Sequence, residues 1–380
     1  MSKMKTIRIS IDESSWEPSP VPQDILAMSR MGIRCTDTDL ALLHTGLWTR
    51  PPEVQGFSLS DCWAWLRYSP ALATTDDLRL RPEWESIDPH QKSVLSDDFG
   101  VGFTTELLSE HLHFLAYVDT LHFVRVLLPG HFVLGQTSKH GPNKSPDYIA
   151  IDNDLNFSVL ECKGTQGSMS RLEYALNGGI AQKANLFATL GSSVKYSLVA
   201  GLYIARWASS TESTIRIVDP ILQEDEQLFP GTPPRQLRAA LVQIALAKHF
   251  ALMGVPSLAN VLSRTTVSEF EGQGLPSAAF EDLAQLPSTD DEPIFRIEYP
   301  SPIVEKEGKD IRARARRVKF RMTCSRRVHR LLRESRDICG TFEAMCEDLR
   351  NMKWKSEASG QAVELHSPLG FQLALGYDYE

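Results

Sequence analysis

The sequence contains no long apolar run and no organised set of cysteines. A helix that crosses a bilayer needs about 18 consecutive apolar residues, and no such run occurs among the 380 residues. The first residues, MSKMKTIRISID, have no apolar core of the kind that a secretory signal carries. The six cysteines are scattered and suggest neither a disulfide framework nor a zinc site. We therefore expect a cytoplasmic protein, in a reducing compartment, that does not enter a membrane.

The negative net charge conceals one strongly basic segment. The formal net charge is −8. Residues 309–336 nevertheless carry twelve lysines and arginines against two acidic residues, a local charge of +10, so the rest of the chain carries −18. A segment of this kind attracts a phosphate backbone. The alternative is that its cations pair with the acidic remainder or with a partner subunit.

Residues 145–165, SPDYIAIDNDLNFSVLECKGT, are the most informative stretch. They predict two short strands joined by a tight turn at residues 153–156, which are rich in turn formers. Pairing the strands about that turn brings Asp147, at the start of the first strand, near Glu161 at the end of the second. Residues two apart in a strand share a face, so Lys163 points the same way as Glu161. Two carboxylates and one ammonium group are therefore expected at one place.

Such a cluster is suited to a metal ion. Two carboxylates a few ångströms apart repel each other unless a cation lies between them. Mg²⁺, for which Mn²⁺ can substitute, takes oxygen ligands and keeps several waters. Asp147, Glu161 and the backbone carbonyl of Cys162 would supply part of its shell, and Lys163 would orient the activated water or stabilise charge on a phosphate. The alternative is an edge-strand salt bridge without a catalytic role.

The same residues carry a family resemblance. The dipeptide Pro-Asp at 146–147 and the tripeptide Glu-Cys-Lys at 161–163 resemble the motif of the PD-(D/E)xK nuclease superfamily. The resemblance covers roughly residues 97–219. It implies a restriction-endonuclease-like α/β core, a central mixed sheet flanked by helices in the order helix, three strands, helix, strand. It also implies a Mg²⁺-dependent endonuclease that hydrolyses phosphodiester bonds, with DNA favoured over RNA. Because the superfamily includes effectors of phage defence, antiviral defence is one expected role.

The segments around the hairpin are interpreted in that order. Residues 97–118 predict the first helix, and Glu106, with Glu110 as an alternative one turn on, is the acidic residue that many members bring to the metal from this helix. A plain first-turn glutamate favoured by the helix dipole is the other interpretation. The apolar runs at 121–128 and 131–135 are the candidates for the first core strand.

The second half of the core follows Lys163. A serine at 168 or 170 begins a predicted helix that extends to about residue 190, and the adjacent Gly178 and Gly179 mark a kink or close packing. Gln182 matches a glutamine that approaches the active site in some branches of the superfamily. Residues 196–206 predict a buried strand and residues 214–218 another.

We expect four parts: an N-terminal region at 1–95, the nuclease core at 96–225, a helical segment at 226–290 and a basic α+β module at 291–380. In the last part, Val318, Phe320 and Met322 alternate with basic residues, which predicts a strand with one apolar and one basic face. A basic helix follows. The residues expected to contact nucleic acid, DNA above all, are Lys139, Lys144, Arg314, Arg316, Arg317, Lys319, Arg321, Arg326, Arg327 and Arg330.

Two other classes of protein stay open at this point. One is an inactive protein with a nuclease fold that binds nucleic acid or acts as a scaffold. The other is a structural protein in which the Asp147, Glu161 and Lys163 triad is an ion-pair cluster and the basic segment binds another protein. No helicase, methyltransferase or nucleotide-binding motif is present, so cleavage would not need a nucleotide hydrolysed by this chain. A homodimer or a regulatory partner is compatible with this interpretation, because an unregulated nuclease would harm its host.

Overall fold

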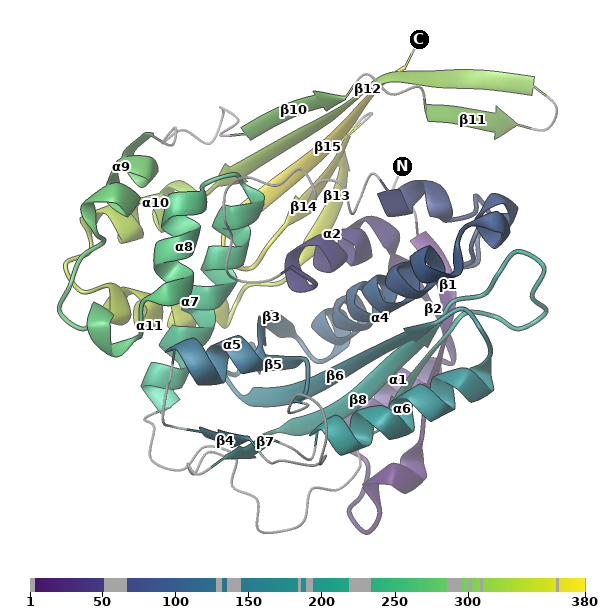
Figure 1. Cartoon of the computed structure of the whole chain (residues 1–380), viewed down its shortest axis with the longest axis horizontal. Helices are drawn as coiled ribbons and strands as arrows, with labels where there is room; N and C mark the ends of the chain where they lie inside the picture. The colour runs from purple at the N-terminus through teal and green to yellow at the C-terminus, as the bar shows by residue number, and fades with distance from the viewer. Residues whose placement is uncertain are drawn as a thin grey trace.

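The computed structural model describes residues 4–50, 67–127, 132–134, 145–183, 186–188, 194–218, 234–285, 295–299, 303–307, 310–359 and 362–379 (Figure 1). The chain is a mixed α/β protein. One seven-stranded mixed sheet is packed with helices, and a second, antiparallel sheet is formed by the C-terminal part of the chain. In the described part of the chain, no helix is both long and apolar enough to span a bilayer.

The seven-stranded sheet has the order β2-β1-β9-β8-β6-β5-β3. Within it, β1 pairs parallel with β9 and β6 pairs parallel with β8, whereas the other neighbours are antiparallel. The N-terminal region thus contributes two strands to this sheet, and the boundary expected after residue 95 falls inside helix α4. The strands are β1 (Met4–Ile11), β2 (Ile33–Asp37), β3 (Phe114–Asp119), β5 (Tyr148–Asp152), β6 (Phe157–Thr165), β8 (Tyr196–Tyr203) and β9 (Thr214–Val218).

Helices α4 (Pro89–His111) and α6 (Met169–Lys183) cover the two faces of the sheet at β6 and β8. Successive residues of a strand point to opposite faces. Accordingly, Leu198 and Leu202 of β8 belong to the main core on the α4 side. Val199 packs instead with Leu172 and Leu176 of α6. Along the chain the elements α4, β3, β5, β6, α6 and β8 occur in this order. Between β3 and β5 lie α5 (Thr120–His122), a π-helical turn (Phe123–Leu127) and β4 (Phe132–Leu134), and the short strand β7 (Leu186–Ala188) lies between α6 and β8.

The prediction for the first helix and the first strand was wrong in its boundaries. The helix begins at Pro89 and ends at His111, not at residue 118, because His113 takes a left-handed conformation with φ of 56° that a helix cannot continue. Residues 114–119 then form β3, and the run at 121–128 is not a strand, since residues 120–127 are helical. Residues 132–134 form the short strand β4, which pairs with β7 (Leu186–Ala188) outside the main sheet. A short run buried on every side satisfies the helical and the strand period equally, so periodicity could not distinguish the two.

The second half of the chain supplies more helices and the antiparallel sheet. This sheet has the order β10-β12-β15-β14-β13, with β11 paired to β12. The predicted alternation in β12 is confirmed where side chains are described, since Phe320 and Met322 are buried and Arg321 is exposed. The elements are α7 (Pro234–Leu252), α8 (Pro256–Arg264), α9 (Ser277–Gln285), β10 (Phe295–Tyr299), β11 (Ile303–Glu307), β12 (Asp310–Cys324), α10 (Arg326–Glu334), α11 (Ile338–Leu349), β13 (Lys355–Ser359), β14 (Ala362–His366) and β15 (Phe371–Tyr379).

An aromatic cluster joins the two sheets. Trp48 ends helix α2 (Thr38–Trp48), which packs on α4, and its ring lies 5.4 Å from the ring of Tyr117 in β3. Trp48 also contacts Trp354, just before β13, at 6.0 Å, and His249 of α7 at 6.1 Å. His249 in turn packs on Phe371 of β15 at 4.7 Å. Buried apolar side chains from both sheets therefore form one continuous core.

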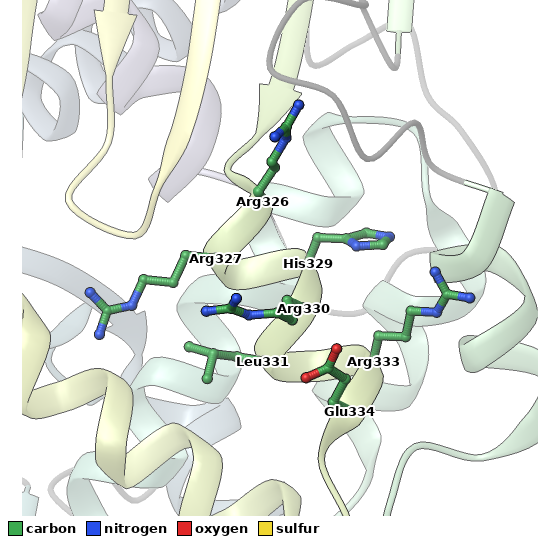
Figure 2. A pocket seen from close by; sticks show the side chains of 7 residues that line it. All are labelled: Arg326, Arg327, His329, Arg330, Leu331, Arg333 and Glu334. Carbon is green, nitrogen blue, oxygen red and sulfur yellow. The ribbon is translucent and has the colours of Figure 1, made fainter.

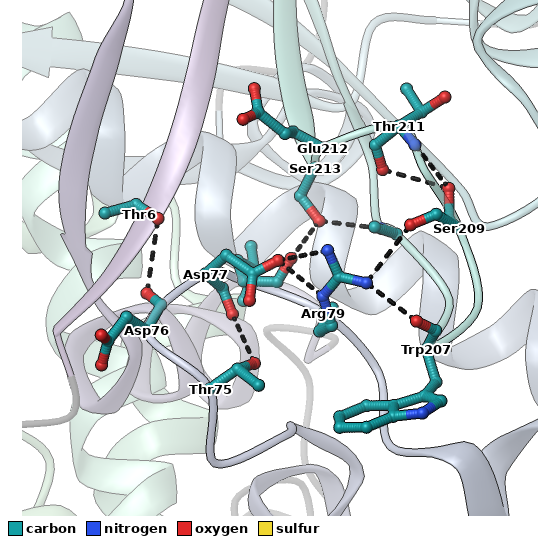
Figure 3. A network of polar contacts seen from close by, with 12 residues as sticks. Thr6, Thr75, Asp76, Asp77, Arg79, Trp207, Ser209, Thr211, Glu212 and Ser213 are labelled. Carbon is teal, nitrogen blue, oxygen red and sulfur yellow. Dashed lines mark hydrogen bonds and ion pairs between the residues drawn. The ribbon is translucent and has the colours of Figure 1, made fainter.

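A polar network fixes the segment after β8 to the N-terminal part of the chain (Figure 3). Arg79 donates from Nη1 to the carbonyl oxygen of Trp207 at 2.8 Å and from Nε to the carboxylate of Asp77 at 2.5 Å. Ser213 donates to the carbonyl of Leu78 and accepts from the amide of Ala205 at 2.8 Å. These bonds hold the turn between β8 and β9 against residues 75–80, close to where β1 joins the sheet.

Candidate active site

The hairpin of β5 and β6 forms as the sequence predicted. Tyr148 pairs with Leu160 and Ile151 with Phe157. The turn is closed by Asp152, whose Oδ1 accepts from the amides of residue 154 at 2.9 Å and residue 156 at 2.8 Å. Asx side chains stabilise turns in this way. The register of the hairpin is therefore set by the turn, and it determines which residues meet at the far end.

At that far end Asp147, Glu161 and Lys163 come together. Oε2 of Glu161 accepts from the backbone amide of Asp147 at 2.9 Å. Oδ2 of Asp147 accepts from the backbone amide of Cys162 at 2.8 Å. The ammonium group of Lys163 is ion-paired with Oε1 of Glu161. The convergence expected from the strand pairing is thus present, and each carboxylate also has a fixed backbone donor.

Burial gives the two carboxyls unusual acidities. The side chain of Glu161 is 0% exposed, and burial together with the nearby Asp147 raises the pKa of Glu161 to about 8. Burial also raises the pKa of Asp147, against the opposing effect of Lys163. Burial lowers the pKa of Lys163, but Glu161 and Asp147 outweigh it and the pKa lies above its ordinary value. A lysine in this setting remains an ammonium ion at neutral pH.

Helix α6 approaches the site closely at Gly179. A Cβ at that position would lie 2.7 Å from Cγ1 of Val199 and 3.0 Å from Cγ of Glu161. It would also lie 3.5 Å from Cε of Lys163. At Gly178 a Cβ would meet nothing within 4 Å. Of the two readings of this glycine pair, close packing is therefore correct for Gly179, which allows the helix to cover the side chains of β6.

The acidic residue that helix α4 brings near the site is Asp97. Lys163 lowers the pKa of Asp97, although burial, the larger effect, raises it. One turn later on the same helix face, a Cβ at Gly100 would lie 2.5 Å from the carbonyl oxygen of Lys163. The sequence analysis missed Asp97, because the contact between Gly100 and β6 that brings this part of α4 to the site cannot be deduced from the helix sequence.

Glu106, expected to join the metal, lies elsewhere. Glu106 is six residues beyond Gly100, which is about 9 Å along the helix axis. Its carboxyl accepts from Oγ1 of Thr36 at 2.7 Å and from the amide of Asp37 at 3.3 Å, the last two residues of β2. Burial raises the pKa of Glu106 to about 8. The alternative, Glu110, is ion-paired with Arg34. The structure brings neither glutamate to Asp147 and Glu161.

A fourth carboxyl, Asp119, comes from the end of β3, and no pattern in the sequence predicts its approach to the site. Its charge raises the pKa of Asp147, and the amide of the next residue donates to the carbonyl oxygen of Asp147 at 3.0 Å. Nζ of Lys248 in α7 lies 2.6 Å from Oδ2 of Asp119 and is fully buried. The same ammonium donates to the carbonyls of Trp48 at 3.1 Å and Arg50 at 2.8 Å, where helix α2 ends. Lys248 therefore connects α7 and the end of α2 to Asp119 at the edge of the site.

A divalent cation at this site would favour the ionised form of the carboxyls around it. The carboxyls of Asp97, Asp119, Asp147 and Glu161, here called the four-carboxyl cluster, carry a charge of −4 when ionised, and the two ammonium groups of Lys163 and Lys248 leave −2. Among the residues that the structure describes, no group of three or more His, Cys, Asp or Glu side chains is placed to hold a metal ion. A metal here would rest on Asp147, Glu161, the carbonyl of Cys162 and water, a shell that Mg²⁺ accepts.

The structure describes the side chains of only some of the other predicted site residues. Lys139 and Lys144 lie outside the described residues. Gln182 belongs to helix α6, and Arg314, Arg316 and Arg317 belong to strand β12, but their side chains are not described. The structure places Lys319 half-buried in β12, Arg321 exposed and 3.9 Å from Glu364, and Arg326, Arg327 and Arg330 exposed on α10. These basic residues belong to the C-terminal part of the chain, away from the strands that carry the four-carboxyl cluster.

Comparison of the chain with protein-family models, with curated proteins and with solved structures finds no match.

Proposed function

We propose that this chain is a metal-dependent nuclease of the PD-(D/E)xK type that hydrolyses phosphodiester bonds, with DNA as the favoured substrate. The observation that carries the proposal is the contact of Asp147, Glu161 and Lys163 at one end of a buried hairpin. The order α4, β3, β5, β6, α6, β8 supports it, because it is the order that the resemblance implies. The elements inserted after β3, and the short strand β7 between α6 and β8, leave the order of the core elements unchanged, because β4 and β7 pair with each other outside the main sheet.

The residues would share the chemistry as follows. Asp147, Glu161 and the carbonyl of Cys162 would hold Mg²⁺ or Mn²⁺, which supplies a water of lowered pKa and neutralises charge on the phosphate. In hydrolysis the water oxygen would form the new bond to phosphorus as the bond from phosphorus to one sugar oxygen breaks; the water would release a proton to solvent and the leaving sugar oxygen would take one up from solvent. Lys163 stays charged and stabilises the negative charge that grows on the phosphate oxygens. The backbone amides of Asp147 and Cys162 keep both carboxylates oriented before the substrate arrives.

The basic residues on β12 and α10 would bind the nucleic acid at the C-terminal part of the chain, away from the site that cuts it. Phosphate contacts position a protein on nucleic acid without reading its sequence. A role in antiviral defence, activation by a partner and a dimeric assembly remain part of the proposal and rest on the resemblance alone.

The test is cleavage of supercoiled plasmid and of total RNA, each with Mg²⁺, Mn²⁺ or EDTA. We expect metal-dependent cleavage by the wild type and by Glu106→Gln, whose carboxyl lies away from the site, and none by Asp147→Asn or Lys163→Ala. Metal-dependent cleavage that survives both site substitutions would place the active site elsewhere. Binding without cleavage by the wild type would favour the inactive nuclease-fold protein.

A further inference from the structure

Helix α10 borders a cavity of about 890 Å³ on the surface of the C-terminal part (Figure 2). Four arginines line it, with Glu334 as the acidic exception: Arg326, Arg327, Arg330 and Arg333. The chain as a whole carries a charge of −8. An anionic polymer is therefore attracted to this place and repelled by most of the remaining surface.

The helix is held firmly on three sides. Ser325 caps it, accepting at Oγ from the amide of residue 328 at 3.3 Å, and the amide of Ser325 donates to the carbonyl oxygen of Gly370 in the β14–β15 turn at 2.8 Å. His329 bonds through Nε2 to the carbonyl oxygen of Leu283 in α9 at 2.8 Å. Arg327 is ion-paired with Asp348 of α11. Because these contacts already hold the backbone of α10 in place, binding through its exposed side chains costs no further backbone entropy.

The four arginines are not equivalent. The pair between Arg327 and Asp348 already satisfies one guanidinium group. Arg330 and Arg333 make no ion pair with any residue of the described ranges and are exposed. Three residues apart on a helix, they lie on one side of it, about 4.5 Å apart along the axis. They are the cations whose binding to a phosphate does not require an existing ion pair to break.

The described part of the lining also offers no aromatic ring on which a base could stack. Proteins that grip single strands combine a basic groove with exposed aromatic rings on which bases stack. Among the residues that the structure describes, the lining holds no Phe, Tyr or Trp: besides the four arginines and Glu334 it includes Leu331 and His329, which is buried and bonded to a backbone carbonyl. Guanidinium groups without stacking partners suit a polymer that presents its phosphates and keeps its bases paired.

We infer that helix α10 binds the phosphate backbone of double-stranded DNA without sequence preference, and that Arg330 and Arg333 are its main contacts. This inference rests on the proposed function in taking DNA as the polymer. It goes further in naming the duplex form, the backbone as the part recognised and the two arginines that carry the binding. Substrate specificity, if the chain has any, then arises at the four-carboxyl cluster or in segments other than α10.

The experiment measures binding alone. Fluorescence anisotropy in EDTA compares two labelled DNA duplexes of unrelated sequence, a single strand of the same length and an RNA duplex, over a range of salt concentrations. We expect equal affinity for both DNA duplexes and weaker binding of the single strand and of the RNA duplex. In Arg330→Ala/Arg333→Ala we expect at least about a 10-fold loss of affinity and a decrease of about 1.8 in the magnitude of the salt slope, the value for two lost phosphate contacts.

The control is Arg327→Ala, which removes a guanidinium group of the same cavity that is already paired. Its salt slope should change by less than half as much. Equal losses in the two variants, tighter binding of the single strand or of the RNA duplex, or a clear preference between the two DNA sequences would each overturn the inference. A wild type that binds duplex DNA in this way but does not cut it would refute the proposed nuclease and leave the binding surface of α10 standing.

Discussion

Substitution of Glu106 by Gln should stabilise the protein, and the gain should grow with pH. Glu106 is completely buried, accepts hydrogen bonds from Oγ1 of Thr36 and the amide of Asp37, and has a pKa raised from 4.5 to about 8 by burial. Below pH 4.5 both the folded and the unfolded chain hold the proton. Between pH 4.5 and 8 the unfolded chain releases it and the folded chain keeps it, so wild-type stability falls as pH rises. Glutamine has no proton to lose.

The size of the gain in stability follows from the pKa shift of Glu106. Each pH unit in that window costs the wild type about 1.4 kcal/mol relative to a residue that does not titrate, which gives about 3 kcal/mol at pH 7. The amide group of glutamine brings a second donor into a buried place, which costs about 1 kcal/mol. A net gain of about 2 kcal/mol at pH 7 corresponds to about 3 °C in Tm for a chain of this length.

Urea unfolding of the wild type and of Glu106→Gln at pH 5, 6, 7 and 8 measures this difference directly. Wild-type-like nuclease activity of the variant would agree with a structural role for Glu106. A stability difference that stays constant from pH 5 to pH 8 would refute the reasoning, because it would mean that Glu106 is ionised in the folded protein. Loss of cleavage in a folded variant would indicate that Glu106 acts in the active site.

Three other perturbations test the site. Saturating Mg²⁺ or Mn²⁺ should raise the stability by about 2.7 kcal/mol at a hundred times Kd, and a thermal shift that persists in Asp147→Asn would locate the metal elsewhere. Lys248→Met leaves a carboxylate without its partner and should cost about 3–5 kcal/mol. In the double variant with Asp119→Asn, more than half of the lost free energy of unfolding should return, as measured by urea unfolding. No recovery would contradict the ion pair between Lys248 and Asp119. Gly179→Ala, which presses a Cβ against β6, should cost about 1–3 kcal/mol and reduce cleavage. Its neighbour Gly178→Ala should gain about 0.5–1 kcal/mol with cleavage unchanged, and equal behaviour of the two would contradict the packing.

The hairpin at the centre of the site was predictable because its information is local. The turn formers at residues 153–156 and the buried runs on either side specify the pairing, and the pairing alone brings Asp147 to Glu161. Strand β9 and the starts of helices α6 and α7 were likewise located closely, since capping and proline signals act over a few residues.

The errors arose where a choice depended on distant parts of the chain. The hydrophobic pattern of residues 114–119 is compatible with a helix as well as with a strand. They form a strand because they pair with β5. Glu106 and Asp97 lie on the same helix, and which of them approaches the site depends on where α4 crosses β6. That crossing is located by the contact between Gly100 and the backbone of Lys163, which no property of the helix sequence reveals.

The amino-acid sequence by itself determined that Asp147, Glu161 and Lys163 meet, since the alternation of a strand and the geometry of a tight turn follow from residues within twenty positions of one another. It also determined the basic character of residues 309–336. Only the tertiary structure decided that Asp97 of α4 and Asp119 of β3, with its partner Lys248 of α7, lie near that triad, because their approach depends on how two helices and a strand pack across the core. Local geometry specifies a hairpin, whereas the surroundings of a buried charge are specified by close packing among segments far apart in the chain.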